Sequence, residues 1–241
     1  MKIIALGDTH GRRIWKSIVA TQKYDCIVLI GDYFDSKEGI TPEEQIQNFS
    51  DLIQFKLENK SKVILLLGNH DYHYLRFAND TYKGFQKSHH HEIQEMLHYA
   101  IDNKLVQMSF LHDNILFTHA GVTNTWLRNN NYDYVTPIDK FMNQLFISHP
   151  LSFAFTIGEN FSPNGDDISQ TPIWVRPNSL FEDAFDDYIQ VVGHTPKNKL
   201  HILNKKIYLI DTLRKSGEFL CIDQGEVSIC KVEETSINLE G

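Results

Sequence analysis

The sequence predicts a mixed α/β fold, and three observations support this fold class. First, short aliphatic runs that are typical of buried strands alternate with amphipathic segments long enough for helices. Second, five of the aliphatic runs end in a polar cluster that combines Gly with Asp, Asn or His. Third, 241 residues with 41% hydrophobic content can bury a substantial core, so we expect a single domain over residues 1–241. The five motifs are KIIALGDTHG (2–11), DCIVLIGDYFD (25–35), KVILLLGNHD (62–71), NILFTHAG (114–121) and YIQVVGHTP (188–196).

Each of the five runs is expected to form a strand, and the segments between them supply helices. Residues 41–44 (Thr-Pro-Glu-Glu) form a capping box with Pro at the first helical position. The helix that they begin has an apolar face at Ile46, Phe49, Ile53 and Leu57. A second apolar stripe at helical spacing consists of Ile93, Met96, Leu97, Ala100 and Ile101.

Three further strands are expected toward the C-terminus, at residues 205–213, 217–223 and 225–232. Gln224 and Gly225 are typical of a tight hairpin turn between the last two. We expect these strands to extend a second sheet, and the polar residues from 233 onward to fray.

Residues 122–175 differ from the rest of the chain, because they combine several aromatic residues with Asn, Gly and Pro in irregular order. Long irregular insertions in a compact domain commonly form lids or mobile loops, so we expect a cap beside the site. We expect the aromatic residues to form a small core of their own rather than a stacking surface for a substrate. They include Trp126, Tyr132, Tyr134 and Phe155.

The polar clusters are expected to converge on one site, because ligands of open α/β sheets bind just beyond the carboxyl ends of the strands. A single Gly-Asp pair after a strand is usually an ordinary turn. Here the same arrangement recurs with carboxylate, amide and imidazole donors in turn, which favours a site for two divalent metal ions. The donors are Asp8, His10, Asp32, Asn69, His119 and His194.

The motifs GDTHG, GDYFD, GNHD, THAG and GHTP, in this order between residues 7 and 196, resemble the signature of the calcineurin-like metallophosphoesterases. They are particularly similar to the protein-phosphatase-type branch, which includes phage and bacterial serine/threonine phosphatases. The resemblance implies the metallo-dependent phosphatase fold. This fold is a four-layer α-β-β-α sandwich of two mixed β-sheets flanked by helices, with the metal site along one edge.

The resemblance also assigns the donors to the two metal ions. A carboxylate can bridge two cations about 3.5–4 Å apart, whereas an imidazole or an amide cannot. A water held between the cations would become a hydroxide nucleophile. Manganese or iron suits these mixed donors, and zinc also fits. Asp8 and His10 would hold one ion, Asn69, His119 and His194 would hold the other, and Asp32 would bridge them.

By the same resemblance, His70 would protonate the leaving-group oxygen, and Asp35 would be its partner. A carboxylate bonded to one ring nitrogen fixes the tautomer of an imidazole and raises its pKa, as a general acid requires. The alternative for Asp35 is a turn residue or a helix cap.

The residues around the motifs bear on the substrate. Residues 193–196 read Gly-His-Thr-Pro, whereas many phosphodiesterases of this superfamily carry Gly-His-x-His, so a monoesterase is favoured. Protein-phosphatase-type sequences usually have a phosphate-binding Arg where this chain has Ser36. Lys37, Arg12 or Arg13 would replace its charge unless these side chains are merely solvated.

Arg176, in the segment IWVRP (173–177), is a second candidate for phosphate binding. The segment resembles the substrate-Arg region of phage and bacterial relatives, and the planar guanidinium can donate two parallel hydrogen bonds to a phosphate. Together with Asn69, it is expected to contact the substrate. An ordinary surface Arg is the alternative.

We therefore expect a dinuclear-metal phosphoesterase that hydrolyses phosphate monoesters of a phosphoprotein or a small molecule. The nucleophile would be a metal-bridging hydroxide that attacks the phosphorus in line. A dinucleoside polyphosphate hydrolase or a phosphodiesterase with the same site is the alternative. A non-catalytic protein-binding scaffold is a third hypothesis, but such relatives typically lose metal ligands or the acid His, and this chain has both.

The composition narrows the classes of partner and the cellular location that we expect. A net charge of −8 with scattered Lys and Arg disfavours a long nucleic acid as partner. No stretch approaches the ~20 apolar residues of a membrane helix, and the first strand begins without a secretion signal, so we expect a cytoplasmic protein. The sequence does not indicate an oligomeric state.

Two further groups of residues have ordinary structural interpretations. Cys26, Cys221 and Cys230 are expected to be core residues rather than to form a disulfide. Residues 89–91 (His-His-His) are expected to form a surface turn rather than to bind a metal ion.

Overall fold

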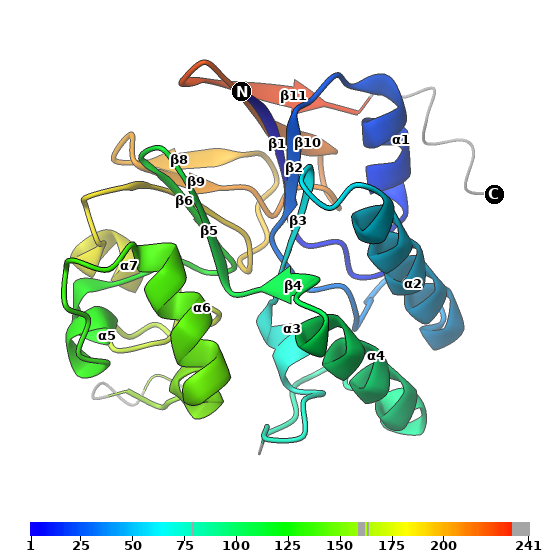
Figure 1. Cartoon of the computed structure of the whole chain (residues 1–241), viewed down its shortest axis with the longest axis horizontal. Helices are drawn as coiled ribbons and strands as arrows, with labels where there is room; N and C mark the ends of the chain where they lie inside the picture. The colour runs from blue at the N-terminus through cyan, green and yellow to red at the C-terminus, as the bar shows by residue number, and fades with distance from the viewer. Residues whose placement is uncertain (79, 159–161, 163, 233–241) are drawn as a thin grey trace.

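Two mixed β-sheets form the centre of the protein in the computed structural model, which describes residues 1–78, 80–158, 162 and 164–232 (Figure 1). The first sheet contains β1 (Lys2–Leu6), β2 (Cys26–Leu29), β3 (Val63–Leu66), β4 (Val106–Gln107), β10 (Glu218–Asp223) and β11 (Glu226–Lys231), in the order β11-β10-β1-β2-β3-β4. The second contains β5 (Ser109–His112), β6 (Ile115–Thr118), β7 (Ile189–Val192), β8 (His201–Leu203) and β9 (Ile207–Leu209), in the order β5-β6-β7-β9-β8.

Parallel pairing brings the strand ends that carry the polar motifs to common edges. In the first sheet, β1, β2, β3 and β4 are parallel neighbours, so their carboxyl ends lie on the same edge. In the second sheet, β6 and β7 are parallel neighbours as well. All five strands that were expected before a polar cluster are present.

The three expected C-terminal strands are present, but their assignment to one second sheet was wrong. Strand β9 joins the second sheet beside β7, whereas β10 pairs antiparallel with β1 and extends the first sheet. This pairing buries Phe219, Leu220 and Ile222 of β10. The turn between β10 and β11 is tight, with positive φ at both Gln224 and Gly225, as the sequence predicts. The expected fraying from residue 233 onward lies outside the described residues.

Alternating side chains of the strands build two apolar layers. In β1, Ile3 and Ala5 face the second sheet and join Phe117 and Val191 of that sheet, whereas Ile4 and Leu6 face helices. The helices α1 (Ile14–Thr21), α2 (Pro42–Glu58) and α4 (His90–Asp102) lie beside the first sheet (Figure 1). Helix α7 (Pro177–Asp183) packs Leu180 on Val192 and Leu209 of the second sheet. The predicted four-layer α-β-β-α sandwich is therefore confirmed.

Helix α2 begins with the predicted capping box. The Thr41 hydroxyl accepts a hydrogen bond from the Glu44 backbone N–H, and the Glu44 carboxylate accepts one from the Thr41 N–H at 2.7 Å. Phe49 and Ile53 are buried on its inner face. The predicted turn at residues 89–91 is instead the end of the short 3₁₀ helix η1 (Lys87–His89) and the start of α4. Among the described residues, no helix is both long and apolar enough to cross a membrane.

The expectation that all three cysteines are unpaired was also wrong. Cys221 and Cys230 form a disulfide between β10 and β11, with their Cα atoms 6.2 Å apart. The register pairs Cys221 with Ser228 and Phe219 with Cys230, so the two cysteines are diagonal neighbours on one face of the hairpin. Spacing alone did not indicate this contact, because it depends on where the turn sets the register. Cys26 is a buried free thiol, as expected.

Residues 122–175 contain two helices and a short 3₁₀ segment, α5 (Asn124–Asn129), α6 (Ile138–Ser148) and η2 (Pro150–Phe153), apart from the undescribed positions 159–161 and 163. Trp126 and Tyr132 are buried, and Trp126 contacts Phe153 with a ring separation of 5.4 Å. Tyr134 is 54% exposed. The rings of α5, α6 and η2 form one apolar cluster with the helix-covered face of the first sheet, so the expectation of a small separate core was wrong. The role of this region as a cap stays a prediction.

Candidate metal centre and active site

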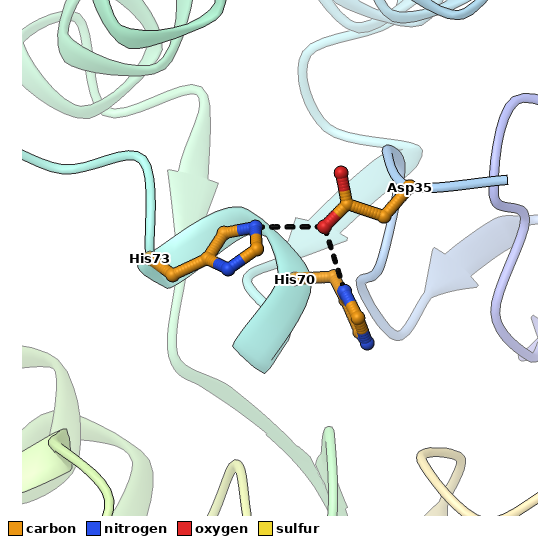
Figure 2. Close-up of side chains that lie close together, drawn as sticks. All are labelled: Asp35, His70 and His73. Carbon is orange, nitrogen blue, oxygen red and sulfur yellow. Dashed lines mark hydrogen bonds and ion pairs between the residues drawn. The ribbon is translucent and has the colours of Figure 1, made fainter. Parts of the chain in front are cut away.

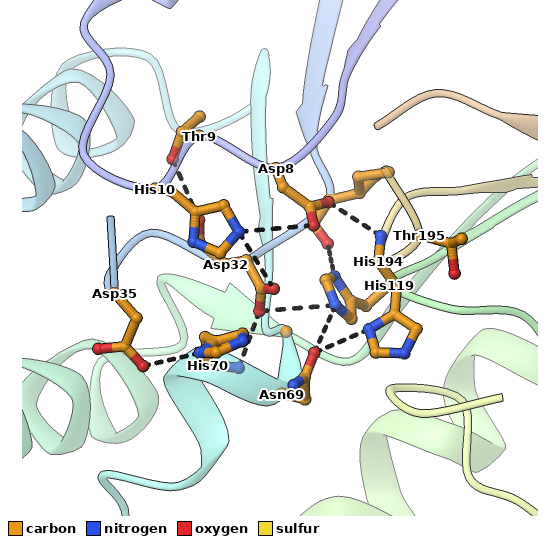
Figure 3. A network of polar contacts seen from close by, with 12 residues as sticks. Asp8, Thr9, His10, Asp32, Asp35, Asn69, His70, His119, His194 and Thr195 are labelled. Atoms are coloured by element: carbon orange, nitrogen blue, oxygen red, sulfur yellow. Dashed lines mark hydrogen bonds and ion pairs between the residues drawn. The ribbon is translucent and has the colours of Figure 1, made fainter. Parts of the chain in front are cut away.

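All six predicted metal donors lie in one cluster, where the carboxyl ends of the strands of both sheets meet (Figure 3). Each follows a strand directly or within a few residues. All are buried except His10, whose side chain is 14% exposed. The order along the chain is Asp8 and His10 after β1, Asp32 after β2, Asn69 after β3, His119 after β6 and His194 after β7.

Asp32 occupies the middle of this cluster. Its Oδ2 lies 3.8 Å from His10 Nε2, and its Oδ1 lies 3.5 Å from His119 Nε2. On one side of it, His10 Nε2 also lies 3.9 Å from Asp8 Oδ2. On the other side, the Asn69 Oδ1 atom lies 3.0 Å from His119 Nε2 and 2.9 Å from His194 Nδ1. The two carboxylate oxygens of Asp32 thus face two different groups of donors.

Backbone carbonyls fix which nitrogen of each imidazole carries the proton. A carbonyl oxygen only accepts, so His10 Nδ1 donates to Phe34 O at 2.6 Å and His119 Nδ1 donates to Ile30 O at 2.8 Å. In the same way, His194 Nε2 donates to Trp174 O at 3.1 Å. The other nitrogen of each ring then carries a lone pair that points into the cluster, which is how a protein prepares an imidazole for a metal ion.

The protonation equilibria of the cluster follow from its burial. Burial lowers the pKa of His10 and of His119 to about 3, so both rings are neutral at physiological pH. Burial and the neighbouring carboxyls raise the pKa values of Asp8 and Asp32, with Asp211 adding to the effect on Asp8. Two buried carboxyls and three imidazole lone pairs face one another, and within the described part of the chain no Lys or Arg forms an ion pair with either carboxyl. These donors fit divalent metal ions, which would compensate the buried negative charge.

Four of the predicted site residues adopt the left-handed backbone conformation. The φ angles are 44° at His10, 54° at Asp32, 63° at Asp35 and 63° at His194. This region is unfavourable for side chains other than glycine, and residues held there are enriched at functional sites. The loops after β1, β2 and β7 therefore accept local strain, which directs His10, Asp32 and His194 into the cluster of metal donors. In the same way, Asp35 is directed toward His70.

Two glycines of the motifs are required by close approach to the carboxylates. A Cβ atom at Gly68 would overlap Asp32 Oδ1, and a Cβ atom at Gly193 would overlap Asp8 Oδ1. The backbone N–H of His194 can consequently donate to Asp8 Oδ1 at 3.0 Å. Glycine at these positions allows the strand ends to close around the donors.

A second cluster lies beside the first and consists of Asp35, His70 and His73 (Figure 2). His70 Nδ1 and His73 Nε2 each lie 2.7 Å from Asp35 Oδ2. The Asp35 carboxyl is buried, and its other oxygen accepts from the Tyr74 hydroxyl. Burial opposes ionisation of Asp35, but the hydrogen bonds from the two histidines outweigh it and lower the pKa of this carboxyl below its ordinary value.

A cavity of about 260 Å³ opens beside the first cluster and reaches His70 of the second. Its lining includes His10, Asp32, Asn69 and His70 together with the cations Lys37, Lys83 and Arg176. Arg176 is half-buried, and it is held by hydrogen bonds to Asn164 O at 2.8 Å and Thr195 Oγ1 at 3.3 Å. Pro196, Tyr82 and Trp174 contribute further to the wall.

The family model for the calcineurin-like phosphoesterases matches residues 1–209 of this sequence. The chain belongs to this family. Family membership identifies it as a phosphoric ester hydrolase, and members of the family depend on two metal ions. No curated protein sequence matches the chain significantly.

Solved structures of other phosphatases share the fold of this phosphoesterase. A cold-active protein-tyrosine phosphatase from a psychrophilic Shewanella species is 19% identical, with a TM-score of 0.59 over 96% of this chain and 80% of that chain. A protein serine/threonine phosphatase from Saccharomyces cerevisiae, with similarity to human phosphatase PP5, is 15% identical, with a TM-score of 0.58 over 97% and 81%. At these identities the likeness shows the fold alone.

The three cations that could replace the missing phosphate-binding Arg have different surroundings in the structure. Lys37 lines the cavity of the phosphoesterase. The Arg12 guanidinium is instead engaged by Glu38 and by the backbone oxygens of Asp8 and Thr9. Arg13 lies at the N-cap of α1.

Sequence reasoning missed three acidic or imidazole residues that support the site. Asp71 accepts hydrogen bonds from the backbone N–H groups of Asp32, Tyr33 and Gly68, at 2.8, 2.8 and 2.9 Å. It thereby ties the loop after β2 to helix α3 (Asn69–Tyr72). Its bond to the Gly68 N–H is only the reach-back half of a capping box, because Gly68 has no side chain to accept a bond in return, so the sequence pattern did not signal it. The other two, Asp211 beside Asp8 and His73 beside Asp35, had no local signal.

Proposed function

We propose that this phosphoesterase hydrolyses phosphate monoesters at a site for two metal ions, with His70 as the general acid. One observation carries the proposal: a cluster of six metal donors, with Asp32 between two groups of them, borders the same cavity as His70, whose ring is bound to Asp35 behind it. Asp8 and His10 would hold one ion, and Asn69, His119 and His194 the other, with Asp32 shared. Bound divalent ions would supply Lewis acidity and lower the pKa of water at the site.

His70 is oriented for proton transfer to a leaving group in the cavity. An ionised carboxylate only accepts, so His70 Nδ1 donates its proton to Asp35 Oδ2, and Nε2 is the nitrogen left for the substrate. The backbone N–H of His70 also donates to Asp32 Oδ1 at 2.8 Å, which sets the distance between the acid and the proposed bridging carboxylate. The protonated ring can release its Nε2 proton to the departing oxygen.

The cations of the cavity suit a phosphate group. Arg176 is the candidate for direct phosphate binding because its fork is held in place by Asn164 and Thr195. Lys37 and Lys83 add exposed positive charge at the cavity wall. Pro196 occupies the wall where a Gly-His-x-His motif would place a second imidazole, which supports monoester over diester substrates.

A dinucleoside polyphosphate is the second candidate substrate. The observation that favours it is the aromatic wall formed by Tyr82 and Trp174, whose ring centroids lie 4.4 Å apart. Aromatic side chains stack on nucleobases. Manganese or iron remains the proposed metal, with zinc as a further candidate, and a cytoplasmic location stays a prediction.

The test is hydrolysis of p-nitrophenyl phosphate beside bis-p-nitrophenyl phosphate by protein supplemented with manganese, with Asp32→Asn as the blank. We expect turnover of the monoester that the substitution abolishes, and at least ~10-fold slower turnover of the diester. Preference for the diester would contradict the assignment to monoesters. Comparison of a phosphopeptide with a dinucleoside tetraphosphate then separates the two substrate classes. Equal turnover by wild type and Asp32→Asn would contradict the proposed metal site itself.

A further inference from the structure

The second imidazole on Asp35 is not explained by the proposed function, which uses only His70. His73 is buried, with 3% of its surface exposed, and its Nε2 reaches the same Asp35 oxygen that binds His70 Nδ1. Burial of a polar side chain costs free energy unless its polar atoms are paired, so the contacts of His73 require an explanation.

The proton of His73 can be assigned from its other nitrogen. The backbone N–H of Tyr82 points at His73 Nδ1 over 3.1 Å. An N–H group only donates, so Nδ1 is an acceptor and the proton of the neutral ring is on Nε2, toward Asp35. Burial lowers the pKa of His73, in accord with a neutral ring.

This assignment decides between two uses of the cluster. Asp35, His70 and His73 have ligand atoms close enough together for a metal ion. A metal ion at His73 Nε2 would need the lone pair that the proton occupies, so the neutral ring presents an N–H rather than a lone pair to the carboxylate. Nε2 makes a close polar contact with Asp35 Oδ2 at 2.7 Å that is not a well-aligned hydrogen bond. Asp35 instead has donors on both oxygens: the two imidazoles on Oδ2, and Tyr74 with Gln86 on Oδ1.

The ring of His73 is itself held by packing. It stacks on Tyr82 with an interplanar angle of 12° and a centroid distance of 5.1 Å, and it contacts Phe85 edge-on at 5.1 Å. Tyr82 in turn lines the cavity and contacts Trp174. His73 therefore connects the cavity wall to the carboxylate that orients His70.

We propose that His73 is a positioning residue for the general acid: the electrostatic contact of its Nε2–H with Asp35 Oδ2, at 2.7 Å, keeps the carboxylate in the orientation that directs His70 at the leaving group. This inference rests on the proposed function, because it assigns a role within the same reaction. Its consequence is specific. Weaker positioning of an acid slows the departure of poor leaving groups, which need a proton, and hardly affects good ones.

Three substitutions separate positioning from packing. His73→Asn places an amide oxygen where Nδ1 accepts from Tyr82 but is too short to reach Asp35. His73→Gln extends an amide N–H to the place of Nε2 and restores the donor to Asp35. His90→Asn is the matched control, because His90 packs on the same Tyr74 and Phe85 rings as His73, at 6.1 and 5.2 Å, and no hydrogen bond or ion pair within the described residues joins it to Asp35.

The measurement is kcat and KM for a series of phosphate monoesters, from 2,4-dinitrophenyl through p-nitrophenyl and phenyl to an alkyl ester. A general acid contributes on the order of 10²–10⁴ in rate, so we expect His73→Asn to lower kcat about 10- to 100-fold for the phenyl and alkyl esters. The dinitrophenyl ester should change less than about 3-fold, with KM unchanged throughout. His73→Gln should recover most of the loss, and His90→Asn should match wild type across the series.

Two results would overturn the inference. One is an equal loss for all leaving groups in folded His73→Asn, as a structural defect would give; the other is no loss at all. A crystal structure of His73→Asn tests positioning without turnover, since an unmoved Asp35–His70 pair would also overturn it. If His73→Asn does not fold, His73→Phe, which keeps the stack on Tyr82, replaces it. Failure of the wild-type protein to hydrolyse any of these esters with manganese, iron or zinc would count against the proposed function instead.

Discussion

The two clusters of histidine and aspartate in this phosphoesterase are built from the same residue types and have opposite hydrogen-bonding character. In the cluster around Asp32, the protons of His10 and His119 are directed outward to backbone carbonyls, and lone pairs face the carboxylates. In the cluster around Asp35, the protons of His70 and His73 are directed inward to the carboxylate. In the first arrangement, no Lys or Arg of the described residues forms an ion pair with Asp8 or Asp32, whereas in the second two imidazole N–H groups face one carboxylate.

The comparison shows that the backbone group beside each imidazole determines whether the inward nitrogen of the ring can bind a metal ion or donate a hydrogen bond. A carbonyl oxygen beside one nitrogen makes the other nitrogen a ligand, whereas an N–H group beside it makes the other nitrogen a donor. His119 beside Ile30 O is an example of the first case, and His73 beside Tyr82 N–H is an example of the second. Substitutions in the two clusters should therefore have separable effects on metal binding and on proton transfer.

The largest effect is expected from Asp32→Asn, which removes the central carboxylate of the first cluster. We expect kcat for p-nitrophenyl phosphate to fall by at least about 10³-fold, which corresponds to about 4 kcal/mol in the activation free energy. Elemental analysis should show fewer than two bound metal ions. Full metal content with unchanged turnover would contradict the central place of Asp32. His70→Asn is the matched control for metal content, because it alters the other cluster.

In the metal-free protein, Asp32→Asn should be favourable, because it should raise the free energy of unfolding. Burial raises the pKa of Asp32, so the folded state binds more protons than the unfolded state, and this carboxyl lowers stability as the pH rises above its unfolded pKa. Asparagine removes that penalty and keeps an oxygen for the His70 N–H. Metal-free Asp32→Asn should therefore unfold at a higher temperature than metal-free wild type at neutral pH. A lower unfolding temperature would show that the buried charge is already compensated.

The next largest effect is expected from His70→Asn, which removes the proposed acid and leaves the first cluster intact. Loss of a general acid should lower kcat for phenyl phosphate about 10²-fold or more. The metal content should stay at the wild-type value, as measured on the same preparation. Loss of metal from His70→Asn would contradict the separate roles of the two clusters, because it would show that the second cluster also contributes to metal binding.

Much of this architecture could be predicted because its signals are local. Every donor of the first cluster follows a strand within a few residues, with Asp8 and His10 both after β1, so the motifs named all six residues of this cluster without tertiary information. The His73 contact could not be found in this way, since it joins His73 to Asp35 in an earlier loop and to the backbone of Tyr82 in a later one. The disulfide between Cys221 and Cys230 and the sheet to which β10 belongs depended equally on pairing between distant segments.

Removal of the metal ions should have a smaller effect, which is a loss of thermal stability. The size of this loss should depend on the first cluster and not on the second. A ligand at 100 times its dissociation constant stabilises the folded state by about 2.7 kcal/mol. In a protein of this size, that corresponds to a rise in Tm of roughly 5–10 °C. We expect this rise on adding manganese to metal-free wild type and to His70→Asn, and its absence in Asp32→Asn. A rise of the same size in all three proteins would place the metal outside the first cluster.

The smallest effect is expected from Tyr74→Phe, which removes one donor from Asp35 and leaves both imidazoles in place. The Tyr74 hydroxyl donates to Asp35 Oδ1, the oxygen that His70 and His73 do not use, and it accepts from the Gln86 N–H at 2.8 Å. One hydrogen bond contributes about 1 kcal/mol, so kcat for phenyl phosphate should fall about 5-fold. Burial and the neighbouring carboxylate raise the pKa of Tyr74, so the hydroxyl stays protonated and the ratio of wild-type to variant kcat should be constant between pH 5 and 9. A ratio of wild-type to variant kcat that changes with pH would contradict this expectation. It would show that Tyr74 alters the protonation of the proposed acid His70 as well as the position of Asp35.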